Sequence, residues 1–219
     1  MTRLAIFDCD GTLVDSGATI RTALCRAFVA HGLEPPPEQV TRRLIGRSLG
    51  EVMSELAPEH DHHALSETYK QAFIAMRGSG EVEEPLYDGI VDLLDRMEGD
   101  GWQLAVATGK SMRGLRHCLE HHGLHARFVS LQTSDDHPSK PHPSMALSAM
   151  IEAGAVPERT VMIGDTAWDM GCARGAGVGA IGVVWGYQDA DELTKGGADA
   201  IASLPTEVAD IAERMTGGA

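Results

Sequence analysis

Two aspartates that follow a short apolar run are the first residues of this chain that could do chemistry. The run covers residues 4–7 and breaks abruptly into Asp8, Cys9, Asp10 and Gly11. Continuous apolarity followed by acid and glycine predicts a buried parallel strand that ends in a loop. Residues i and i+2 of an extended backbone point the same way, so Asp8 and Asp10 are expected to face one small volume. Two carboxylates held together resist ionisation unless a cation or a proton lies between them.

A second acidic pair, Asp165 and Asp169, follows another apolar run, residues 160–163. Its spacing of four residues predicts two carboxylates on one side of a helical turn. For any of these acids taken singly, an exposed loop position is the alternative. Four acids at the carboxyl ends of parallel strands would share one pocket, and their repulsion would demand a hard cation. Carboxylate, carbonyl and water ligands select magnesium, so Mg²⁺ is the expected cofactor.

The elements that must position these residues alternate along most of the chain. Short apolar runs predict strands near residues 4–7, 104–107, 128–131, 160–163, 180–184 and 200–202, with amphipathic helices between most of them. Such alternation indicates a parallel sheet with helices on both faces, which binds ligands at the carboxyl ends of its strands. The predicted fold is therefore α/β, a Rossmann-like doubly wound parallel sheet.

The stretch after the first strand departs from this alternation. About 65 residues show helical periodicity and no convincing strand, which is long for a crossover between parallel strands. This length predicts an inserted helical cap domain over residues 16–82. The α/β core domain would then comprise residues 1–15 and 83–219.

Composition restricts the classes of partner. The 219 residues carry a formal net charge of −14, which argues against nucleic acid or an anionic membrane surface as a partner. No apolar run approaches the roughly 18 residues of a membrane span, and the amino terminus lacks the pattern of a signal peptide. A cytoplasmic monomer or homodimer is expected. The four cysteines show no metal-binding spacing.

The motifs together resemble the haloacid dehalogenase superfamily, in particular its capped, phosphoglycolate phosphatase-like branch. The resemblance is carried by DCDGT followed by DS at the first strand, by GDTAWD around the second acidic pair, by Thr108, and by Lys140 within SKPHP. The stretches WGYQDADEL and GADAIASLP are also similar to that branch. One departure is Gly109, which stands where relatives often carry asparagine.

The resemblance implies a role for each motif residue. Asp8 would be the nucleophile, and Asp10 would act as the general acid and base. Asp8, Asp165 and the backbone carbonyl of Asp10 would hold Mg²⁺, with Asp169 contributing directly or through water. Thr108 and Lys140 would also take part in catalysis, because a hydroxyl and a cation stabilise the phosphoryl group. The residues implied in substrate binding are Thr108, Gly109, Lys140 and Arg47, the last in a cap loop where it would pair with a carboxylate or a second phosphate.

These inferences predict a magnesium-dependent phosphoric monoester hydrolase that acts on a small phosphorylated metabolite through an aspartyl-phosphate. Phosphoglycolate is the best single guess for the substrate. The alternative within enzymes is phosphoryl transfer like that of β-phosphoglucomutase, which would require a sugar bisphosphate activator. A regulatory protein that has kept the fold without turnover is the alternative outside enzymes.

Overall fold

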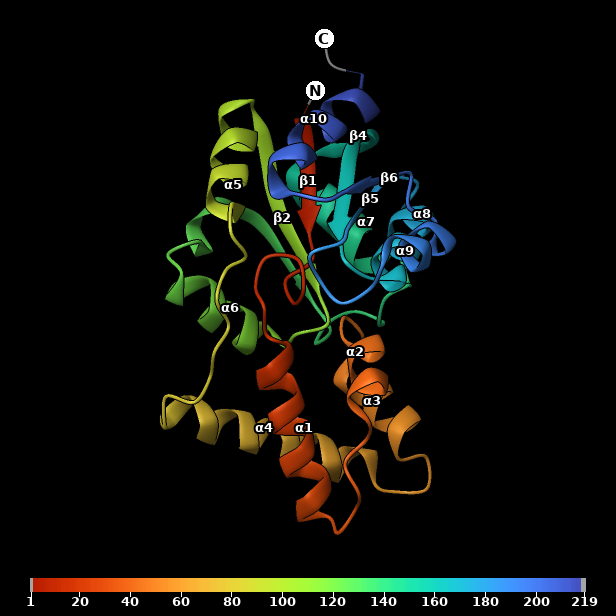
Figure 1. The fold of residues 1–219 in the computed structure, drawn as a ribbon. Coiled ribbons are helices and arrows are strands. Elements are labelled where there is room, and N and C mark those ends of the chain that lie inside the picture. The colour runs from red at the N-terminus through yellow and green to blue at the C-terminus, as the bar shows by residue number, and fades with distance from the viewer. Residues whose placement is uncertain (1, 218–219) are drawn as a thin grey trace.

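Six parallel strands form one sheet in a computed structural model that describes residues 2–217 (Figure 1). The strand order is β3-β2-β1-β4-β5-β6. The strands are β1 (Thr2–Phe7), β2 (Trp102–Thr108), β3 (Phe128–Thr133), β4 (Ala155–Gly164), β5 (Gly179–Val183) and β6 (Ala200–Ala202). The order reverses between β1 and β4, so the carboxyl ends of these two central strands form the place where such sheets bind ligands. The predicted α/β fold is confirmed.

Helices cover both faces of the sheet, and each face has its own apolar cluster. On one face α5 (Ile90–Gly99), α6 (Met112–His121) and α10 (Pro205–Met215) share an apolar cluster with Ala5 and Phe7 of β1. On the other face α7 (Ser144–Ala153), α8 (Ala167–Ala176) and α9 (Ala190–Gly196) share a second cluster with Leu4 and Ile6. A short 3₁₀ helix, His125–Arg127, precedes β3. The alternation of β1 side chains between two buried faces explains why its sequence is apolar throughout.

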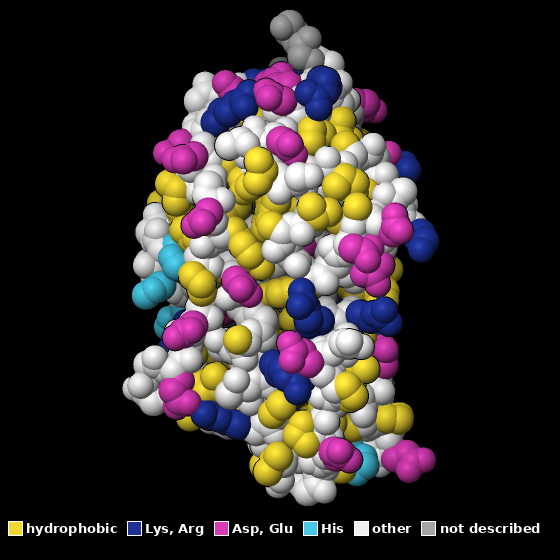
Figure 2. Space-filling model, viewed as in Figure 1, with side chains coloured by type: hydrophobic (Ala, Val, Ile, Leu, Met, Phe, Trp, Pro, Cys, Tyr) yellow, Lys and Arg dark blue, Asp and Glu magenta, His cyan; other side chains and the backbone are white. Residues whose placement is uncertain are grey.

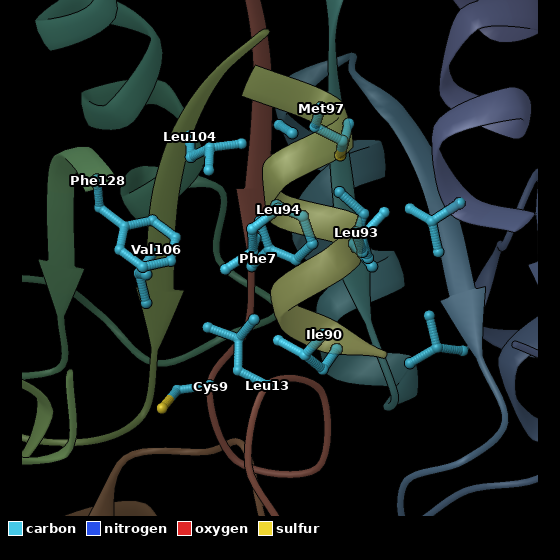
Figure 3. Packing of buried hydrophobic residues seen from close by; sticks show 14 of the residues in the cluster. Phe7, Cys9, Leu13, Ile90, Leu93, Leu94, Met97, Leu104, Val106 and Phe128 are labelled. Carbon is cyan, nitrogen blue, oxygen red and sulfur yellow. The ribbon is translucent and has the colours of Figure 1, made fainter. Parts of the chain in front are cut away.

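Figure 3 shows the first of these clusters, in which Phe7 lies against Leu93 and Leu94 of α5. Cys9 belongs to the same cluster although it stands between two aspartates in the sequence. Its buried thiol therefore fills part of the core and lies apart from the acids on either side of it.

The helix α9 was not anticipated from the sequence, where the polar stretch after Gln188 shows no apolar periodicity. Asp189 caps it: its side chain accepts a hydrogen bond from the backbone N–H of Glu192, 2.9 Å away, while the Glu192 side chain accepts one from the Asp189 backbone. This reciprocal cap can start a short helix that buries only one large side chain, Leu193.

Four further helices lie together beyond the carboxyl ends of the strands (Figure 1). They are α1 (Gly17–Ala30), α2 (Glu38–Leu44), α3 (Leu49–Leu56) and α4 (His62–Gly78), and we call them the helical segment. The helical segment has a small apolar cluster of its own, which includes Leu24, Phe28, Met53 and Leu65. Of the helices within residues 2–217, none combines the length and apolarity of a membrane span. The division into a cap over residues 16–82 and a core over 1–15 and 83–219 stays a prediction.

The chain enters and leaves the helical segment at neighbouring points. Val14 and Leu86 form an antiparallel bridge, and the backbone N–H of Asp15 donates to the carbonyl of Pro85 over 2.8 Å. We call residues 14–17 the first crossing and residues 79–86 the second crossing. Because hydrogen bonds join them, any movement of the helical segment must act on both crossings together.

Candidate active site

Three aspartates converge at the carboxyl ends of β1 and β4. Asp8 follows β1, Asp165 follows β4, and Asp169 lies in the first turn of α8. One carboxylate oxygen from each of the three lies within 4.8 Å of the other two, and all three residues are fully buried. We call them the acid cluster. Because β1 and β4 are paired in parallel, with Phe7 beside Ile163, the residue after each strand comes to the same edge of the sheet.

Lys140 is the counter-charge within the acid cluster. Its Nζ lies 2.9 Å from Oδ1 of Asp8 and 2.6 Å from Oδ1 of Asp169, and it donates to the carbonyl of Ala107 over 3.2 Å. The lysine is fully buried in the segment between β3 and α7. Burial lowers its pKa, but the two carboxylates outweigh burial and raise that pKa above its usual value. One ammonium among three carboxylates leaves an excess of negative charge.

Asp169 reaches the cluster by a route that the four-residue spacing did not predict. Asp165 precedes α8 and Thr166 is its N-cap, so the two acids do not lie on one side of a helical turn. Oδ2 of Asp169 accepts hydrogen bonds from the backbone N–H of Thr166 at 3.0 Å and from its hydroxyl at 2.6 Å. This capping box fixes the carboxylate at the start of α8, and its other oxygen faces Lys140.

Asp165 is held by neutral donors. Oδ1 accepts from the hydroxyl of Thr12 at 3.0 Å, and Oδ2 accepts from the backbone N–H of Tyr187 at 2.9 Å. Gly11, with φ +90°, packs against this carboxylate, because a Cβ atom there would lie 2.7 Å from Oδ1 of Asp165. The glycine of the DCDGT motif is therefore required both for its turn and for space.

Asp8 carries the unsatisfied polar atoms of the site. Neither of its buried oxygens makes a hydrogen bond of good geometry, and only Oδ1 has the ion pair with Lys140. Burial raises the pKa of Asp8 to about 7, against the opposing effect of Lys140. Burial and the charge of Asp169 likewise raise the pKa of Asp165. A buried carboxylate oxygen without a partner, facing two further carboxylates, has the donor set and the charge that fit a hard divalent cation.

Asp10 lies beside the acid cluster and has polar partners of its own. Strand β1 ends at Phe7, and the turn that follows directs Oδ1 of Asp10 to the hydroxyl of Ser16 and to Nζ of Lys110, which lies 2.7 Å away. Lys110 also lies 2.7 Å from Oε1 of Glu84. Burial lowers the pKa of Lys110, but the two carboxylates raise it well above its usual value, so the ammonium stays charged. The expectation that Asp8 and Asp10 share one volume stays a prediction.

Thr108 and Gly109 end the neighbouring strand β2. Thr108 is fully buried, and its hydroxyl accepts from the backbone N–H of Lys110 at 3.2 Å. Gly109 lies against the backbone of the helical segment, because a Cβ atom at this position would overlap the carbonyl oxygen of Arg47 and lie 2.8 Å from that of Gly46. Glycine, in place of the asparagine that relatives often carry here, leaves room for this close approach.

The loop between α2 and α3 covers the acid cluster. Gly46, with φ +94°, lies so that a Cβ atom would be 3.3 Å from the hydroxyl of Thr166 and 3.9 Å from Oδ2 of Asp8. The backbone N–H of Ser48 donates to the hydroxyl of Ser139 at 2.8 Å. On the other side, the indole N–H of Trp168 donates to the carbonyl of Arg43 at 3.1 Å. The structure therefore shows the helical segment closed over the nucleophile candidate.

Comparison with known proteins assigns the family. The model of the haloacid dehalogenase-like hydrolases matches residues 5–183, which include the acid cluster, Thr108 and Lys140. The chain belongs to this family. The prediction made from its motifs is therefore confirmed, and the protein is an enzyme of the hydrolase class.

Several known proteins resemble the chain over most of its length. A probable phosphatase, IndB, from Dickeya dadantii (strain 3937) is 33% identical over 98% of this chain and 95% of its own length. Tyrosine-protein kinase PtkA from Mycobacterium tuberculosis (strain H37Rv) is 31% identical over 88% of this chain and 66% of its own. A phosphoglycolate phosphatase from Agrobacterium fabrum (strain C58) is 34% identical over 85% of this chain and 82% of its own. The structure of a hydrolase from Pseudomonas syringae superimposes with a TM-score of 0.84, at 27% identity, over 97% of this chain and 99% of that one.

Arg47, expected from the family resemblance to contact substrate, is engaged within the helical segment. Its guanidinium pairs with Glu51 at 2.8 Å and with Glu55, and lies 4.9 Å from the ring centroid of Trp168. Binding a substrate carboxylate would require it to exchange one of these acidic partners. Its role in substrate binding stays a prediction, as do the roles of Thr108 and Gly109.

Basic side chains gather where the helical segment meets the sheet layer (Figure 2). A pocket of about 230 Å³ at this junction is lined by Arg21 and Arg42 together with Tyr87, Trp185 and Tyr187. Tyr187 also donates its backbone N–H to Asp165, so a single residue forms part of both the pocket wall and the support of the acid cluster. In this haloacid dehalogenase-like hydrolase, the pocket and the acid cluster are direct neighbours.

Trp168, Ser139 and Glu84 are among the residues at the site that had no role assigned from the sequence. Trp168 lies inside the GDTAWD motif and Ser139 directly precedes Lys140, so both could have been suspected from their neighbours. Glu84 carries no such signal, because it lies in an acidic stretch after the helical segment. Its buried position beside Lys110 is a product of the tertiary fold.

Proposed function

We propose that this chain is a magnesium-dependent phosphatase that hydrolyses a small phosphorylated metabolite through an aspartyl-phosphate on Asp8. The observation that carries the proposal is the Asp8 carboxylate. It is fully buried, its Oδ2 has no partner, and it lies between Lys140 and two further carboxylates. A carboxylate without hydrogen bonds is a stronger nucleophile than one that is fully solvated or capped.

Charge repulsion is the first obstacle to such a reaction. A phosphate monoester is a dianion, and Asp8 would have to approach it in a site that already holds excess negative charge. Asp8 and Asp165, with the backbone carbonyl of Asp10 and with Asp169 directly or through water, would hold Mg²⁺. When bound, Mg²⁺ would neutralise charge on the carboxylates and the phosphoryl oxygens. Lys140 would supply the second positive charge, since its ammonium already contacts Asp8.

The reaction would then proceed in two displacement steps, in which residues of the chain form the bond to phosphorus and transfer the protons. In the first, an oxygen of Asp8 forms a bond to phosphorus while the ester oxygen leaves with a proton from Asp10. In the second, the Asp10 carboxylate takes a proton from water, whose oxygen bonds to phosphorus as the bond to Asp8 breaks. The hydroxyl of Thr108 would donate to a phosphoryl oxygen in both steps.

The position of the covering loop favours a small substrate. Backbone of Gly46 lies over Asp8 in the closed arrangement, so the leaving group must fit beneath main chain or displace it. Phosphoglycolate is our single best candidate. It is supported by the similarity to the Agrobacterium fabrum enzyme of that name and by the position of Arg47, whose planar guanidinium suits a carboxylate. Location in the cytoplasm and a monomeric or homodimeric state stay predictions.

Phosphate release from a panel of phosphorylated metabolites tests the proposal. The panel is run with and without Mg²⁺ on the wild type, on Asp8→Asn, and on Asp136→Asn, an exposed acid that serves as control. We expect release that needs both Mg²⁺ and Asp8 and that the control retains. Arms with sugar phosphates plus a bisphosphate primer, and with ATP plus a tyrosine peptide, detect a mutase or a kinase. Turnover in either of those arms alone, or full activity of Asp8→Asn, would overturn the proposal.

A further inference from the structure

Lys140 is carried by residues 134–143, which connect β3 to α7 and which we call the lysine loop. Its ammonium contacts Asp8, Asp169 and the carbonyl of Ala107, all on other elements. A lysine side chain is a flexible four-carbon stem with a compact charge at its end. The place of that charge therefore depends on where the loop holds the backbone of residue 140.

A half-buried histidine of the lysine loop joins the two elements on either side of it. Nε2 of His137 lies 2.7 Å from Oε1 of Gln132 in β3. Nδ1 of the same ring lies 2.7 Å from the hydroxyl oxygen of Ser144, the first residue of α7. Both ring nitrogens thus have partners, and the imidazole closes the loop at its base.

Gln132 is itself fixed by a neighbour on β3. Its Nε2 donates to the hydroxyl of Ser130 over 2.7 Å, and both residues are buried. With its amide nitrogen engaged, Gln132 presents a carbonyl oxygen to His137. Nε2 of the ring therefore donates to Gln132, and Nδ1 accepts from the Ser144 hydroxyl. We call Ser130, Gln132, His137 and Ser144 the polar brace, and because every member has a partner, it specifies one arrangement of the loop.

On its other side the lysine loop packs against α8, the helix that also contributes to the acid cluster. A Cβ atom at Gly171 would lie 2.6 Å from Cβ of Pro141, and one at Gly175 would lie 3.1 Å from Cβ of Pro143. The loop is therefore held between α8 and β3, with Lys140 directly before the first of these prolines. Loss of the brace would free the side toward β3 and leave the packing on α8 in place.

We propose that His137 is a positioning residue that acts on Lys140 through the polar brace. The brace holds the lysine loop at the distance from β3 at which the ammonium of Lys140 reaches Asp8 and the transferring phosphoryl group. The inference rests on the proposed function in one respect, the role of Lys140 as the positive charge at that group. A displacement of about 1 Å in such a group can lower the rate about 100-fold, because stabilisation of charge in the transition state depends on placement.

Kinetics on two esters test the inference. In His137→Leu we expect kcat to fall about 10- to 100-fold on both phosphoglycolate and p-nitrophenyl phosphate, because both transfer the same phosphoryl group. KM should change less than about threefold, since the groups that contact the leaving group are untouched. His137→Gln keeps a donor toward Gln132, so its kcat should fall less than about fivefold. His117→Leu, at an exposed position of α6, is the matched control and should alter neither constant.

Ser144→Ala removes one contact of the polar brace and serves if His137→Leu folds poorly. It should lower kcat about three- to tenfold, and its addition to His137→Leu should cause no further loss, because both changes break one connection.

A second readout does not depend on turnover. Acylation of lysine amines by acetic anhydride, followed by mass spectrometry of the peptides, reports the exposure of each amine. Lys140 is fully buried, so in the wild type it should react far more slowly than the exposed Lys195. In His137→Leu the rate at Lys140 should rise at least about tenfold, and the rate at Lys195 should stay the same.

Unchanged kcat in both His137→Leu and Ser144→Ala, a loss confined to KM, or unchanged labelling of Lys140 would overturn the inference. A wild type that releases phosphate from no ester would instead overturn the proposed function. The labelling would still decide whether the polar brace holds Lys140 in place.

Discussion

Gly109 lies directly against the backbone carbonyl of Arg47, with no room between them for a Cβ atom. The first residue directly follows strand β2, and the second belongs to the loop that covers the acid cluster. Gly109→Ala should therefore hold the covering loop away from Asp8. We expect kcat/KM for the metabolite substrate to fall about 10- to 100-fold, because closure places the reacting groups.

The matched control for that change is Gly50→Ala. A Cβ atom there meets nothing within 4 Å, and the position lies in the helix α3. It should leave kcat/KM unchanged. Hydrogen exchange over residues 44–49 should rise only in Gly109→Ala, and unchanged exchange together with full activity would show that the close approach is dispensable.

Replacement of Arg47 should separate substrate recognition from loop support. In Arg47→Met we expect KM for phosphoglycolate to rise about tenfold more than KM for p-nitrophenyl phosphate, since only phosphoglycolate offers a carboxylate to the guanidinium. Loss of the contacts with Glu51, Glu55 and Trp168 should affect both substrates equally. Arg43→Met, on the neighbouring helix with a side chain 75% exposed, is the control. A parallel rise for both esters would limit Arg47 to holding the loop.

The metal-free enzyme should lose stability as pH rises. The pKa of Asp8 is raised to about 7 in the folded state, above its unfolded value near 3.8. Between these values the folded state keeps a proton that the unfolded state releases, so folding becomes less favourable with increasing pH. Asp8→Asn should weaken this dependence, leaving the part due to the raised pKa of Asp165, and should stabilise the metal-free protein at about pH 8 by about 1–3 kcal/mol.

Thermal unfolding in a chelator, followed by addition of Mg²⁺, measures this dependence. Mg²⁺ should raise Tm of the wild type more at about pH 8 than at about pH 5, because protonated carboxyls bind cations poorly. Asp8→Asn should show a smaller shift at both values. A wild-type Tm that is independent of pH and of Mg²⁺ would contradict the assignment of a cation site to the acid cluster.

Lys140→Met should be among the most destabilising single changes in the chain. It leaves Asp8 and Asp169 buried without their shared cation, which costs about 3–5 kcal/mol at neutral pH. The loss should shrink on acidification, as the carboxyls take up protons. Urea unfolding at neutral and acidic pH compares this variant with Lys195→Met, an exposed lysine on α9 whose loss should be nearly neutral. Equal stability of the two variants would show that Lys140 is not an essential counter-charge.

The ends of the strands were predictable because their signals are local. Apolar runs that stop at acid, threonine or glycine place Asp8, Thr108 and Asp165 at one edge of a parallel sheet, and the structure has all three strands there. The ion pair of Asp10 with Lys110 was not predictable, because the two residues are distant in the chain. The position of Asp169 was expected for the wrong reason: a capping box with Thr166, rather than helical spacing, brings it to the cluster.

The antiparallel pairing of Val14 with Leu86 sets the two ends of the intervening segment side by side. Neighbouring ends of this kind can be joined by a loop of a few residues at little entropic cost. The helical segment is therefore an exchangeable module: it can be shortened, enlarged or replaced by another without breaking any strand of the sheet. Such an exchange would leave Asp8, Lys140 and Asp165 on their own supports and change only which molecules reach them.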